Sequence, residues 1–394
     1  MAVSDRARVV LRHGRDRTVR GGNPWIFSQA IERVDPSPLE PGAIVEVVDA
    51  AGVAFGYGHY NPDTTIAVRM IAAAGEPGPD RIVKHRISRA MQLRERVVTG
   101  ETDCYRLVNG DGDGLPGVVI DRYGDVFVVQ LLTAGADRMR DEVVVTLEEL
   151  AHPRCVIERS HGAVRKREGL DDRVGPLNGD EVSEVAAVEN GIRIQVDLAH
   201  GQKTGYFLDQ RENRMRVRLL GAASILDAYC YAGGFTLAAL AGGATRMVAI
   251  DTSARALSWA RRNLALNTHE AAPVEFIHGE ATAYMAQSGR EFDLVVLDPP
   301  PLARSIKDVT RAGHLYMELN ALAMRALKPG GYLITFSCSA HFRGEDFVRA
   351  VRFAQAKSGR NFRMLARLGA GPDHPVLLGH PEGEYLTGVM LVEL

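Results

Sequence analysis

The clearest indication of the fold is the stretch ILDAYCYAGGFTLAAL (225–240), which reads as an apolar strand, a glycine-containing bend and the start of a helix. Gly233 and Gly234 have no side chain, so the backbone here can approach a ligand closely. A loop that binds a dinucleotide typically has a third glycine beside the pyrophosphate, and this stretch lacks it. The bend therefore favours a ligand without a phosphate. Taken alone, a tight strand-to-helix turn with no ligand explains it equally well.

The chain around this stretch alternates strands with helices. From about residue 186 the strand-like runs are SILDA, RMVAID, VEFIH, FDLVVLD and GYLITFS, with helical stretches between them. Such alternation predicts a parallel, doubly wound sheet. The last two runs, NFRMLARL and YLTGVMLVEL, are joined by a loop and should pair antiparallel. This is the outline of class I S-adenosylmethionine (SAM) methyltransferases, so we predict that α/β, Rossmann-like fold for residues 186–394.

Acidic residues follow two of these strands. Asp251 ends RMVAID, 24 residues after Asp227, where an acid can accept hydrogen bonds from both hydroxyls of a ribose. The alternative role is to cap the next helix, for which Thr252 or Ser253 would serve equally. Glu280 follows the third strand, where it can accept from an adenine amino group or remain a solvated loop residue.

Two further residues at this edge could carry chemistry. The fourth strand ends in VVLDPPP (295–301), which puts Asp298 where parallel sheets bind ligands. Cys338 ends the fifth strand, at the same edge. A free thiol of pKa about 8.5 is only a few per cent thiolate at pH 7, so a nucleophilic role requires local activation. Considered by itself, Cys338 is better explained as a buried core residue.

The first half of the chain has a different pattern. Residues 1–73 consist of short β-like runs cut by Gly, Pro and Asn-Pro, as in a small β-barrel. After the linker-like AAAGEPGP, residues 74–185 predict a small α+β domain with an amphipathic helix near Arg81–Arg96, a hairpin around Tyr123 and a helix near 137–151. We therefore expect three domains, at residues 1–73, 74–185 and 186–394.

The composition excludes several classes of protein. The chain has 394 residues, 46% hydrophobic and 24% charged, which is typical of soluble proteins with packed cores. No apolar run approaches the roughly 18 residues of a membrane span, and the N-terminus lacks the apolar segment of a secretion signal, so we expect a cytoplasmic protein without membrane contacts. The scattered Cys104, Cys155, Cys230 and Cys338 predict neither a disulfide framework nor a metal site.

Basic residues are clustered although the formal net charge is only −2. Six arginines and two aspartates fall within residues 1–20, and further basic stretches run from Arg81 to Arg96 and from Arg159 to Arg167. Each stretch alone is usually a solvated face of a helix or strand. Three of them together favour contacts with nucleic-acid phosphates. The residues expected to contact RNA are Arg12, Arg15, Arg20, Arg165 and Lys166.

Several stretches in one order resemble a known family. They are GQKTGYFLDQRENR (201–214), LDAYCYAGGF, VLDPP, TFSCS and DHPVLLGHPEGEYLTG (373–388). Together they look like the bacterial large-subunit ribosomal RNA cytosine-5 methyltransferases, which have an N-terminal PUA domain and a small middle domain. GGNPWIFSQAI (21–31) resembles the PUA entry, and RLVNGDGDGLPGVVIDRYGD (106–125) and ERSHGAVRKREGL (158–170) resemble the middle domain. The resemblance implies SAM as cofactor and large-subunit ribosomal RNA as partner; it leaves a homodimer open.

The resemblance also implies roles for individual residues. Lys203, Tyr206 and Arg211 would close over SAM, Asp227, Tyr229 and Gly233 would hold its methionine part, and Asp251 would bind the ribose. Glu280 stands where the family usually has Asp at the adenine. Asp298 matches the fourth-strand acid, and Cys338 matches the catalytic nucleophile. The chain departs from the family at Pro301-Leu302, where Lys-Phe is expected, which bears on how the target base is contacted.

The implied chemistry explains the need for a thiol. A thiolate that adds to cytosine C6 makes the ring enamine-like, so that C5 can accept the SAM methyl group, while Asp298 can hydrogen-bond to N3 or the amino group as charge develops. The nearest rival is a methyltransferase acting on a nitrogen of guanine or adenine, which also uses Asp-Pro-Pro motifs but has no use for Cys338. A second rival is an RNA-binding or assembly factor that has lost turnover.

Overall fold

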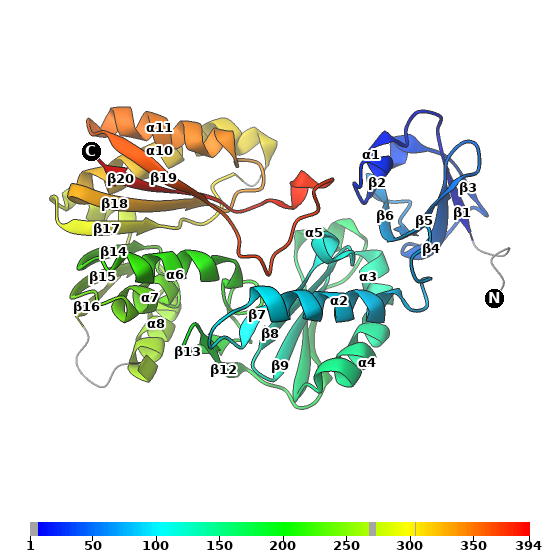
Figure 1. Ribbon diagram of the computed structural model, residues 1–394, viewed down its shortest axis with the longest axis horizontal. Helices are drawn as coiled ribbons and strands as arrows, with labels where there is room; N and C mark the ends of the chain where they lie inside the picture. The colour runs from blue at the N-terminus through cyan, green and yellow to red at the C-terminus, as the bar shows by residue number, and fades with distance from the viewer. Residues whose placement is uncertain (1–6, 268–272, 304) are drawn as a thin grey trace. The chain divides into compact units, whose positions relative to one another are not determined.

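A computed structural model describes residues 7–267, 273–303 and 305–394 of the chain (Figure 1). The fold divides into two units. Unit 1 comprises Met1–Ala187, Val196–Gly205 and Pro372–Gly383, and unit 2 comprises Val188–Gln195, Tyr206–Gly371 and Glu384–Leu394. The boundary crosses a hairpin of β12 (Glu184–Glu189) and β13 (Ile192–Asp197). The first two predicted domains both lie in unit 1, and their division at residue 73 stays a prediction.

The N-terminal part of unit 1 is a six-stranded mixed sheet. Its strands lie in the order β2-β6-β5-β4-β1-β3. Their bounds are β1 (Arg8–Leu11), β2 (Trp25–Phe27), β3 (Ile31–Asp35), β4 (Ala43–Val48), β5 (Ala54–Tyr60) and β6 (Ile66–Ala73). Val9, Val45, Val47 and Val68 share its apolar core, as expected for β-branched residues in strands. One short helix, α1 (Arg17–Arg20), interrupts this β-rich segment.

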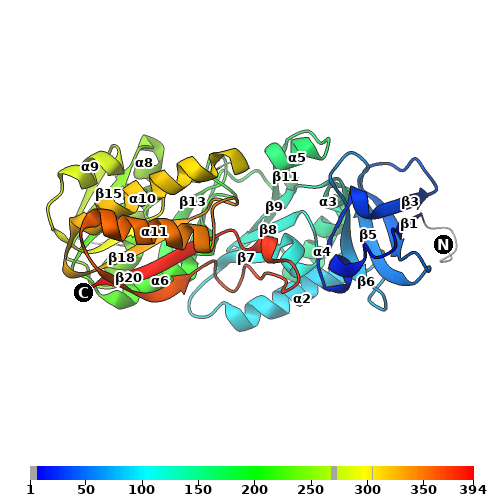
Figure 2. The ribbon, with the colours of Figure 1, turned by 90° about the horizontal axis from the view of Figure 1, so that it is seen from above.

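The second part of unit 1 is a five-stranded sheet covered by helices. The strand order is β11-β10-β9-β8-β7. The bounds are α2 (Ile82–Val97), β7 (Cys104–Asn109), β8 (Val118–Tyr123), β9 (Val126–Leu131), α3 (Ala134–Arg138), α4 (Arg140–Ala151), β10 (Cys155–Ser160), α5 (Ala163–Arg167) and β11 (Arg173–Asn178). Ile87 of α2 and Val143 and Leu147 of α4 pack into one core with the sheet, and Figure 2 shows α2 running along β7. The helix expected near 137–151 is divided at Met139 into α3 and α4.

Unit 2 contains a seven-stranded sheet in the order β16-β15-β14-β17-β18-β20-β19. The strands are β14 (Ser224–Ala228), β15 (Arg246–Asp251), β16 (Val274–His278), β17 (Phe292–Leu297), β18 (Leu327–Ser337), β19 (Phe362–Leu368) and β20 (Thr387–Glu393). β14 to β18 run parallel. β20 pairs antiparallel with both β18 and β19. The parallel sheet with a terminal antiparallel pair, predicted from the sequence, is confirmed.

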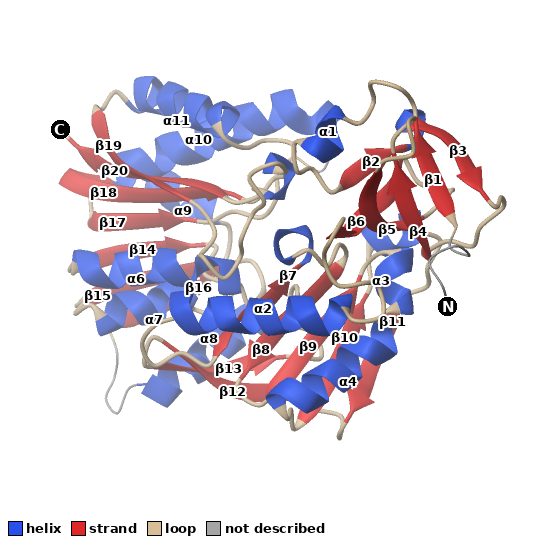
Figure 3. Ribbon diagram, turned by 45° about the vertical axis from the view of Figure 1, so that its right-hand side comes forward, coloured by secondary structure: helices blue, strands red, loops and turns tan. Residues whose placement is uncertain are grey.

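Helices cover both faces of this sheet. They are α6 (Arg211–Leu220), α7 (Gly234–Ala241), α8 (Ala254–Asn267), α9 (Ala281–Gln287), α10 (Val309–Ala326) and α11 (Glu345–Ser358). α9, α10 and α11 share one core with Leu226, Val295 and Leu333, whereas α6 and α7 share another with the alternate strand residues Ile225 and Val296. Figure 3 shows α10 and α11 side by side along the sheet. Within the described ranges, no helix is long and apolar enough to cross a membrane.

Candidate functional site

Acidic and thiol side chains follow successive parallel strands at one edge of the unit 2 sheet. Asp227 lies near the end of β14, and Asp251 ends β15. Glu280 follows β16, Asp298 follows β17 and Cys338 follows β18. Because these strands run parallel, the five residues lie at their carboxyl ends, where open α/β sheets bind ligands. This edge is therefore the candidate site.

Asp227 has a buried carboxyl group whose two oxygens differ in their hydrogen bonding. The side chain is 1% exposed, and its Oδ2 accepts a hydrogen bond of 2.6 Å from Thr236 Oγ1. Oδ1 is buried and has no hydrogen-bond partner among the described residues. Burial raises the pKa of Asp227 to about 6. Since an unsatisfied buried acceptor is costly, the site fits a ligand that brings an ammonium or N–H group to this oxygen.

The loop after β14 is held in an unusual backbone conformation. Tyr229, Tyr231 and Gly233 all have positive φ, at 67°, 49° and 81°. For the two tyrosines this backbone conformation is uncommon and costs free energy. Residues with such strained backbones cluster at functional sites. The loop is fixed by hydrogen bonds from Cys230 N to Ile250 O (3.0 Å) and from Tyr231 N to Asp251 Oδ2 (2.9 Å). These two hydrogen bonds tie the loop to the end of β15, beside the sheet edge.

The hydroxyl group of Tyr229 lies near the carboxylates of Glu280 and Asp251. Burial, then the charges of Glu280 and Asp251, raise the pKa of the Tyr229 hydroxyl to about 12. Glu280 is exposed and immediately precedes α9, and its side chain makes no capping hydrogen bond. The structure therefore groups three of the residues assigned to SAM by resemblance.

Asp251 does not cap the helix that follows it. Ser253 Oγ accepts from Ala256 N at 3.2 Å and so caps α8. Asp251 Oδ1 accepts from Ser253 N at 2.8 Å. The carboxylate thus joins two loops at the sheet edge and retains further lone pairs for a ligand.

Tyr206 and Arg211 are buried in the segment that leads into α6. Tyr206 is 4% exposed, and the Arg214 guanidinium lies 4.6 Å from its ring centre. A Cβ at Gly234 would lie 2.5 Å from Tyr206 Oη, so a larger residue at this position would displace the end of the Tyr206 side chain. Arg211 is 1% exposed, with Nη2 3.2 Å from Glu212. Lys203, by contrast, belongs to the segment Val196–Gly205 of unit 1 and has a φ of 53°.

Asp298 is oriented by a chain of amide groups. Gln210 is buried and donates from Nε2 to Asp298 Oδ2 at 3.0 Å. Gln210 Oε1 in turn accepts from Asn213 Nδ2 at 2.6 Å, and Asn213 also donates to the carbonyl of Gly369 at 2.9 Å. The amide of Gln210 is therefore held with its NH₂ group toward Asp298. One carboxylate oxygen of Asp298 is fixed by this contact.

Cys338 lies beside the residue that follows Asp298. Its Sγ donates to the carbonyl oxygen of Pro299 at 3.6 Å, and the side chain is partly exposed. The adjoining Ser339 Oγ accepts from Leu302 N (3.0 Å) and lies 3.0 Å from Tyr316 Oη. The ends of β17 and β18 are thus tied together, with the thiol and the carboxylate at the junction. Pro301, which departs from the family pattern, is exposed.

Three residues of this site were missed from the sequence: Gln210, Arg214 and Ser339. Gln210 and Arg214 occur within the quoted stretch GQKTGYFLDQRENR, but nothing in that stretch indicates which side chains face Asp298 or Tyr206. Arg214 also forms two hydrogen bonds, of 2.6 and 2.5 Å, with Glu189. These contacts link residues far apart in the chain, so spacing gives no signal for them.

The arginines expected to contact RNA are in different environments. Arg12, Arg15 and Lys166 are exposed. Arg20 is exposed too, but it pairs with Asp16 (2.5 Å) and Asp49 (3.0 Å). These two ion pairs already occupy part of the Arg20 guanidinium, which leaves fewer of its N–H groups for a phosphate.

For Arg165 the structure contradicts the expectation. The side chain is 1% exposed, donates from Nη1 to Leu131 O at 2.6 Å and also pairs with Asp137 at 2.7 Å. Its Nε donates to the carbonyl of Asp171. A guanidinium enclosed in this way stabilises unit 1 and does not reach an RNA, so the adjacent Lys166 is the exposed cation of that stretch.

Comparison with known proteins gives two family matches along the chain. The profile of the S-adenosylmethionine-dependent methyltransferase family matches residues 105–379, and that of a PUA-like domain matches residues 9–73. The ribosomal RNA large subunit methyltransferase I of Pseudoalteromonas atlantica is 39% identical over 392 residues, covering 98% of both chains. The protein of the same name from Escherichia coli is 35% identical over 389 residues, covering 97% of this chain and 98% of that protein.

Solved structures share the fold at lower identity. A candidate SAM-dependent methyltransferase from Streptococcus mutans superposes with a TM-score of 0.81 at 20% identity, covering 98% of this chain and 99% of that chain. SMU.776, a candidate methyltransferase complexed with S-adenosylhomocysteine (SAH), gives a TM-score of 0.83 at 21% identity with the same coverage. The class I methyltransferase fold of unit 2 and the PUA-like N-terminal domain predicted from the sequence are both confirmed.

Proposed function

The chain belongs to the family of S-adenosylmethionine-dependent methyltransferases represented by the ribosomal RNA large subunit methyltransferases I, and we propose that it methylates carbon 5 of a cytosine in large-subunit ribosomal RNA. The family membership gives SAM as the cofactor. The names of the relatives support ribosomal RNA as the substrate. The choice of cytosine C5 depends on the residues at the sheet edge.

One observation carries this choice: Cys338 Sγ hydrogen-bonds to the carbonyl of Pro299, directly beside Asp298. A methyltransferase that acts on a ring nitrogen needs an acid or amide at this edge but no thiol. A cytosine-5 enzyme needs both, because C5 becomes nucleophilic only after a thiolate has added to C6. Cys338 is partly exposed, whereas Cys104, Cys155 and Cys230 are buried, so it is the cysteine best suited to meet a base.

In the proposed reaction the Cys338 thiolate forms a bond to C6, and the electron pair of the C5–C6 double bond moves toward C5. SAM would supply an electrophilic methyl group to C5 and leave as S-adenosylhomocysteine. Transfer of the C5 proton to a base then lets the C5–H electron pair restore the C5–C6 double bond, and the electron pair of the C6–S bond leaves with Cys338 as a thiolate. Asp298, oriented by Gln210 at 3.0 Å, accepts from the amino group of the ring as a carboxylate, or donates to N3 as a carboxylic acid when negative charge develops there.

The RNA would be held mainly through its backbone. The exposed Arg12, Arg15 and Lys166 lie in unit 1, which contains the PUA-like domain. A-form RNA hides its major groove, so a protein reads it by shape and backbone contacts. The target cytosine must leave any stack to reach Cys338, which suits a flipped base or an unpaired loop.

The affinity for SAM is expected to fall below pH 6. The methionine part of SAM carries an ammonium group, and the carboxylate of Asp227 binds it only when ionised. Since burial raises the pKa of Asp227 to about 6, affinity should be constant above pH 7 and fall about tenfold per pH unit well below pH 6. Calorimetry from pH 5 to 8 measures this. Asp227→Asn should bind SAM weakly, and its affinity should not change with pH. A wild-type affinity for SAM that does not depend on pH would contradict the role assigned to Asp227.

Replacing Asp251 with alanine should weaken SAM binding by about 1.5–3 kcal/mol, the range for a lost hydrogen bond to a charged group. The loss includes the anchor of the Tyr231 backbone, because Asp251 Oδ2 accepts from that amide at 2.9 Å. Glu275→Ala is the matched control, an exposed acid within β16. Calorimetric affinity equal to wild type in Asp251→Ala would remove Asp251 from the cofactor site.

The product identifies the reaction directly. Ribosomal RNA from a strain that lacks the protein should be incubated with purified protein and SAM, digested to nucleosides and analysed by mass spectrometry. We expect one new 5-methylcytosine in large-subunit RNA. A methylated guanine or adenine would establish the nitrogen-methylation rival, and no new methyl group in any RNA would favour the binding factor that has lost turnover.

A further inference from the structure

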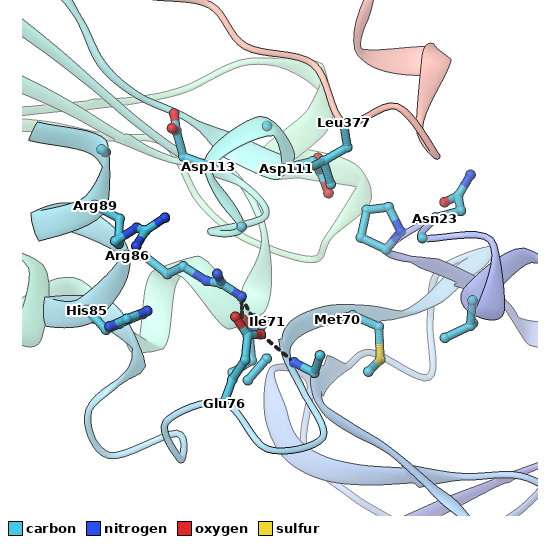
Figure 4. Close-up of a pocket in the computed structure, with 18 of the residues that line it drawn as sticks. Asn23, Met70, Ile71, Glu76, His85, Arg86, Arg89, Asp111, Asp113 and Leu377 are labelled. Atoms are coloured by element: carbon cyan, nitrogen blue, oxygen red, sulfur yellow. Dashed lines mark hydrogen bonds and ion pairs between the residues drawn. The ribbon is translucent and has the colours of Figure 1, made fainter. Parts of the chain in front are cut away.

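Unit 1 contains a cavity of about 600 Å³ that the proposed methyl transfer does not use (Figure 4). Its walls come from segments far apart in the chain: the strands β5 and β6, the helix α2, the loop after β7, and Leu377. All of these belong to unit 1. Its volume is within the range of about 300–1,000 Å³ that small-molecule sites occupy.

The carboxylates around the cavity are already committed to protein partners. Glu76 pairs with Arg86 at 2.7 Å and accepts from Ala73 N at 2.7 Å, as the dashed lines in Figure 4 show. Asp113 receives two hydrogen bonds from the buried Arg94, of 2.6 and 2.7 Å.

Asp111 has a different partner. It accepts from Trp25 Nε1 at 3.0 Å, and burial raises its pKa. Each of the three acids thus has a hydrogen-bond partner within unit 1.

Cationic donors remain at the helical wall. Arg89 lies one turn after His85 and Arg86 on the same face of α2. Arg89 is exposed, and no described carboxylate pairs with it. The buried Nε of Arg86 has no hydrogen-bond partner among the described residues. An anion at this wall would therefore meet Arg89, whose charge no described carboxylate balances, and the unpaired Nε of Arg86.

The opposite wall is apolar with one polar group beside it. Phe55 and Met70 come from β5 and β6. Asn23 lines the cavity as well, and its Oδ1 accepts from Trp25 N at 2.9 Å, which leaves its NH₂ group available as a donor. A ligand that fits must combine an anion, an apolar planar part and a hydrogen-bonding edge.

From these features we infer that the cavity binds one unstacked nucleotide of the RNA, with its phosphate at Arg86 and Arg89 and its base against Phe55 and Met70. Proteins recognise unpaired RNA by stacking splayed bases on aromatic and apolar side chains and holding the adjoining phosphates with arginine. The inference rests on the proposed RNA substrate, but it concerns binding and does not depend on which base is methylated.

The test compares two charge reversals on one helix. Arg89→Glu should weaken binding of a transcribed large-subunit rRNA fragment at least about tenfold and lower the slope of log affinity against log salt by about 1 or more. Arg96→Glu is the matched control, because Arg96 is exposed on α2 but does not line the cavity. It should change affinity less than about threefold. SAM affinity should be unchanged in both variants. Equal losses in the two would indicate general electrostatic attraction and overturn the inference.

A second measurement distinguishes bound RNA from a free nucleotide. A 4-thiouridine-substituted rRNA fragment, irradiated on the protein, should crosslink to peptides containing Phe55, Met70 or residues 85–93. The four nucleoside 5′-monophosphates, titrated separately, should bind only weakly. Tight binding of a monophosphate together with unchanged RNA affinity in Arg89→Glu would assign the cavity to a free nucleotide instead. Neither assay requires methyl transfer, so both can still be interpreted if the cytosine-5 proposal fails.

Discussion

Replacing Cys338 with alanine is expected to abolish methyl transfer, a loss on the order of 10⁴-fold or more, while SAM affinity stays within about twofold of wild type. The reason is that the thiol is proposed to make the bond to C6 that activates C5, and its contact with the Pro299 carbonyl at 3.6 Å puts it beside Asp298. Single-turnover methylation of the rRNA fragment, with calorimetry for SAM, separates the two effects.

Cys230→Ala is the control for this experiment. Cys230 lies in the loop between β14 and α7, is 5% exposed and packs with Ala249 and Leu257. Burial, together with Asp227 and Asp251, raises the pKa of its thiol well above the usual value, so it is protonated and unreactive. Its replacement should leave methyl transfer near wild type. Substantial activity in Cys338→Ala would transfer support to the nitrogen-methylation rival.

Asp298→Asn should lower kcat by about 10²–10³-fold, the usual loss when a preorganised group that stabilises developing charge is removed. The side chain remains similar in shape and can still accept from Gln210 Nε2, so the change tests the charge of the carboxylate. SAM affinity should fall less than about tenfold, which distinguishes a role toward the base from one toward the cofactor alone.

Asp293→Asn provides the matched comparison for Asp298. Asp293 lies near the start of the same strand, β17, where it accepts from Ser224 and pairs with Lys328 at 3.0 Å. Its loss should affect stability more than turnover. If both variants lost activity through misfolding, the midpoint temperatures of their unfolding transitions would decrease by similar amounts. If Asp298→Asn retained a wild-type kcat, its carboxylate would have no part in the reaction.

Much of unit 2 could be predicted from the sequence because its strands and helices have strong local patterns. Apolar runs such as LVVL ending in Asp298 indicate buried parallel strands, and the loop between the last two runs indicates their antiparallel pairing. The order of acids along such strands then places them at one edge by topology alone. Asp227, Asp251 and Asp298 were found in this way.

Other features depend on contacts between distant segments, which local patterns do not encode. Gln210 meets Asp298 across 88 positions of the chain. Arg165 looks like an exposed cation in a basic stretch, but Leu131 and Asp137 enclose it. The segment Pro372–Gly383 follows the strand β19 of unit 2 in sequence, but it belongs to unit 1, where Arg94 donates to the carbonyl of Asp373 at 2.7 Å.

The covalent intermediate is the most direct test of the proposed mechanism. Wild-type protein, SAM and an rRNA fragment made with 5-fluorocytosine should form a stable protein–RNA complex, because fluorine at C5 prevents the proton removal that expels the cysteine. Digestion and mass spectrometry should locate the methylated base on the peptide that contains Cys338, with no complex in Cys338→Ala and normal trapping in Cys230→Ala. A fully methylation-competent enzyme that forms no such adduct, or forms it on another residue, would contradict the account.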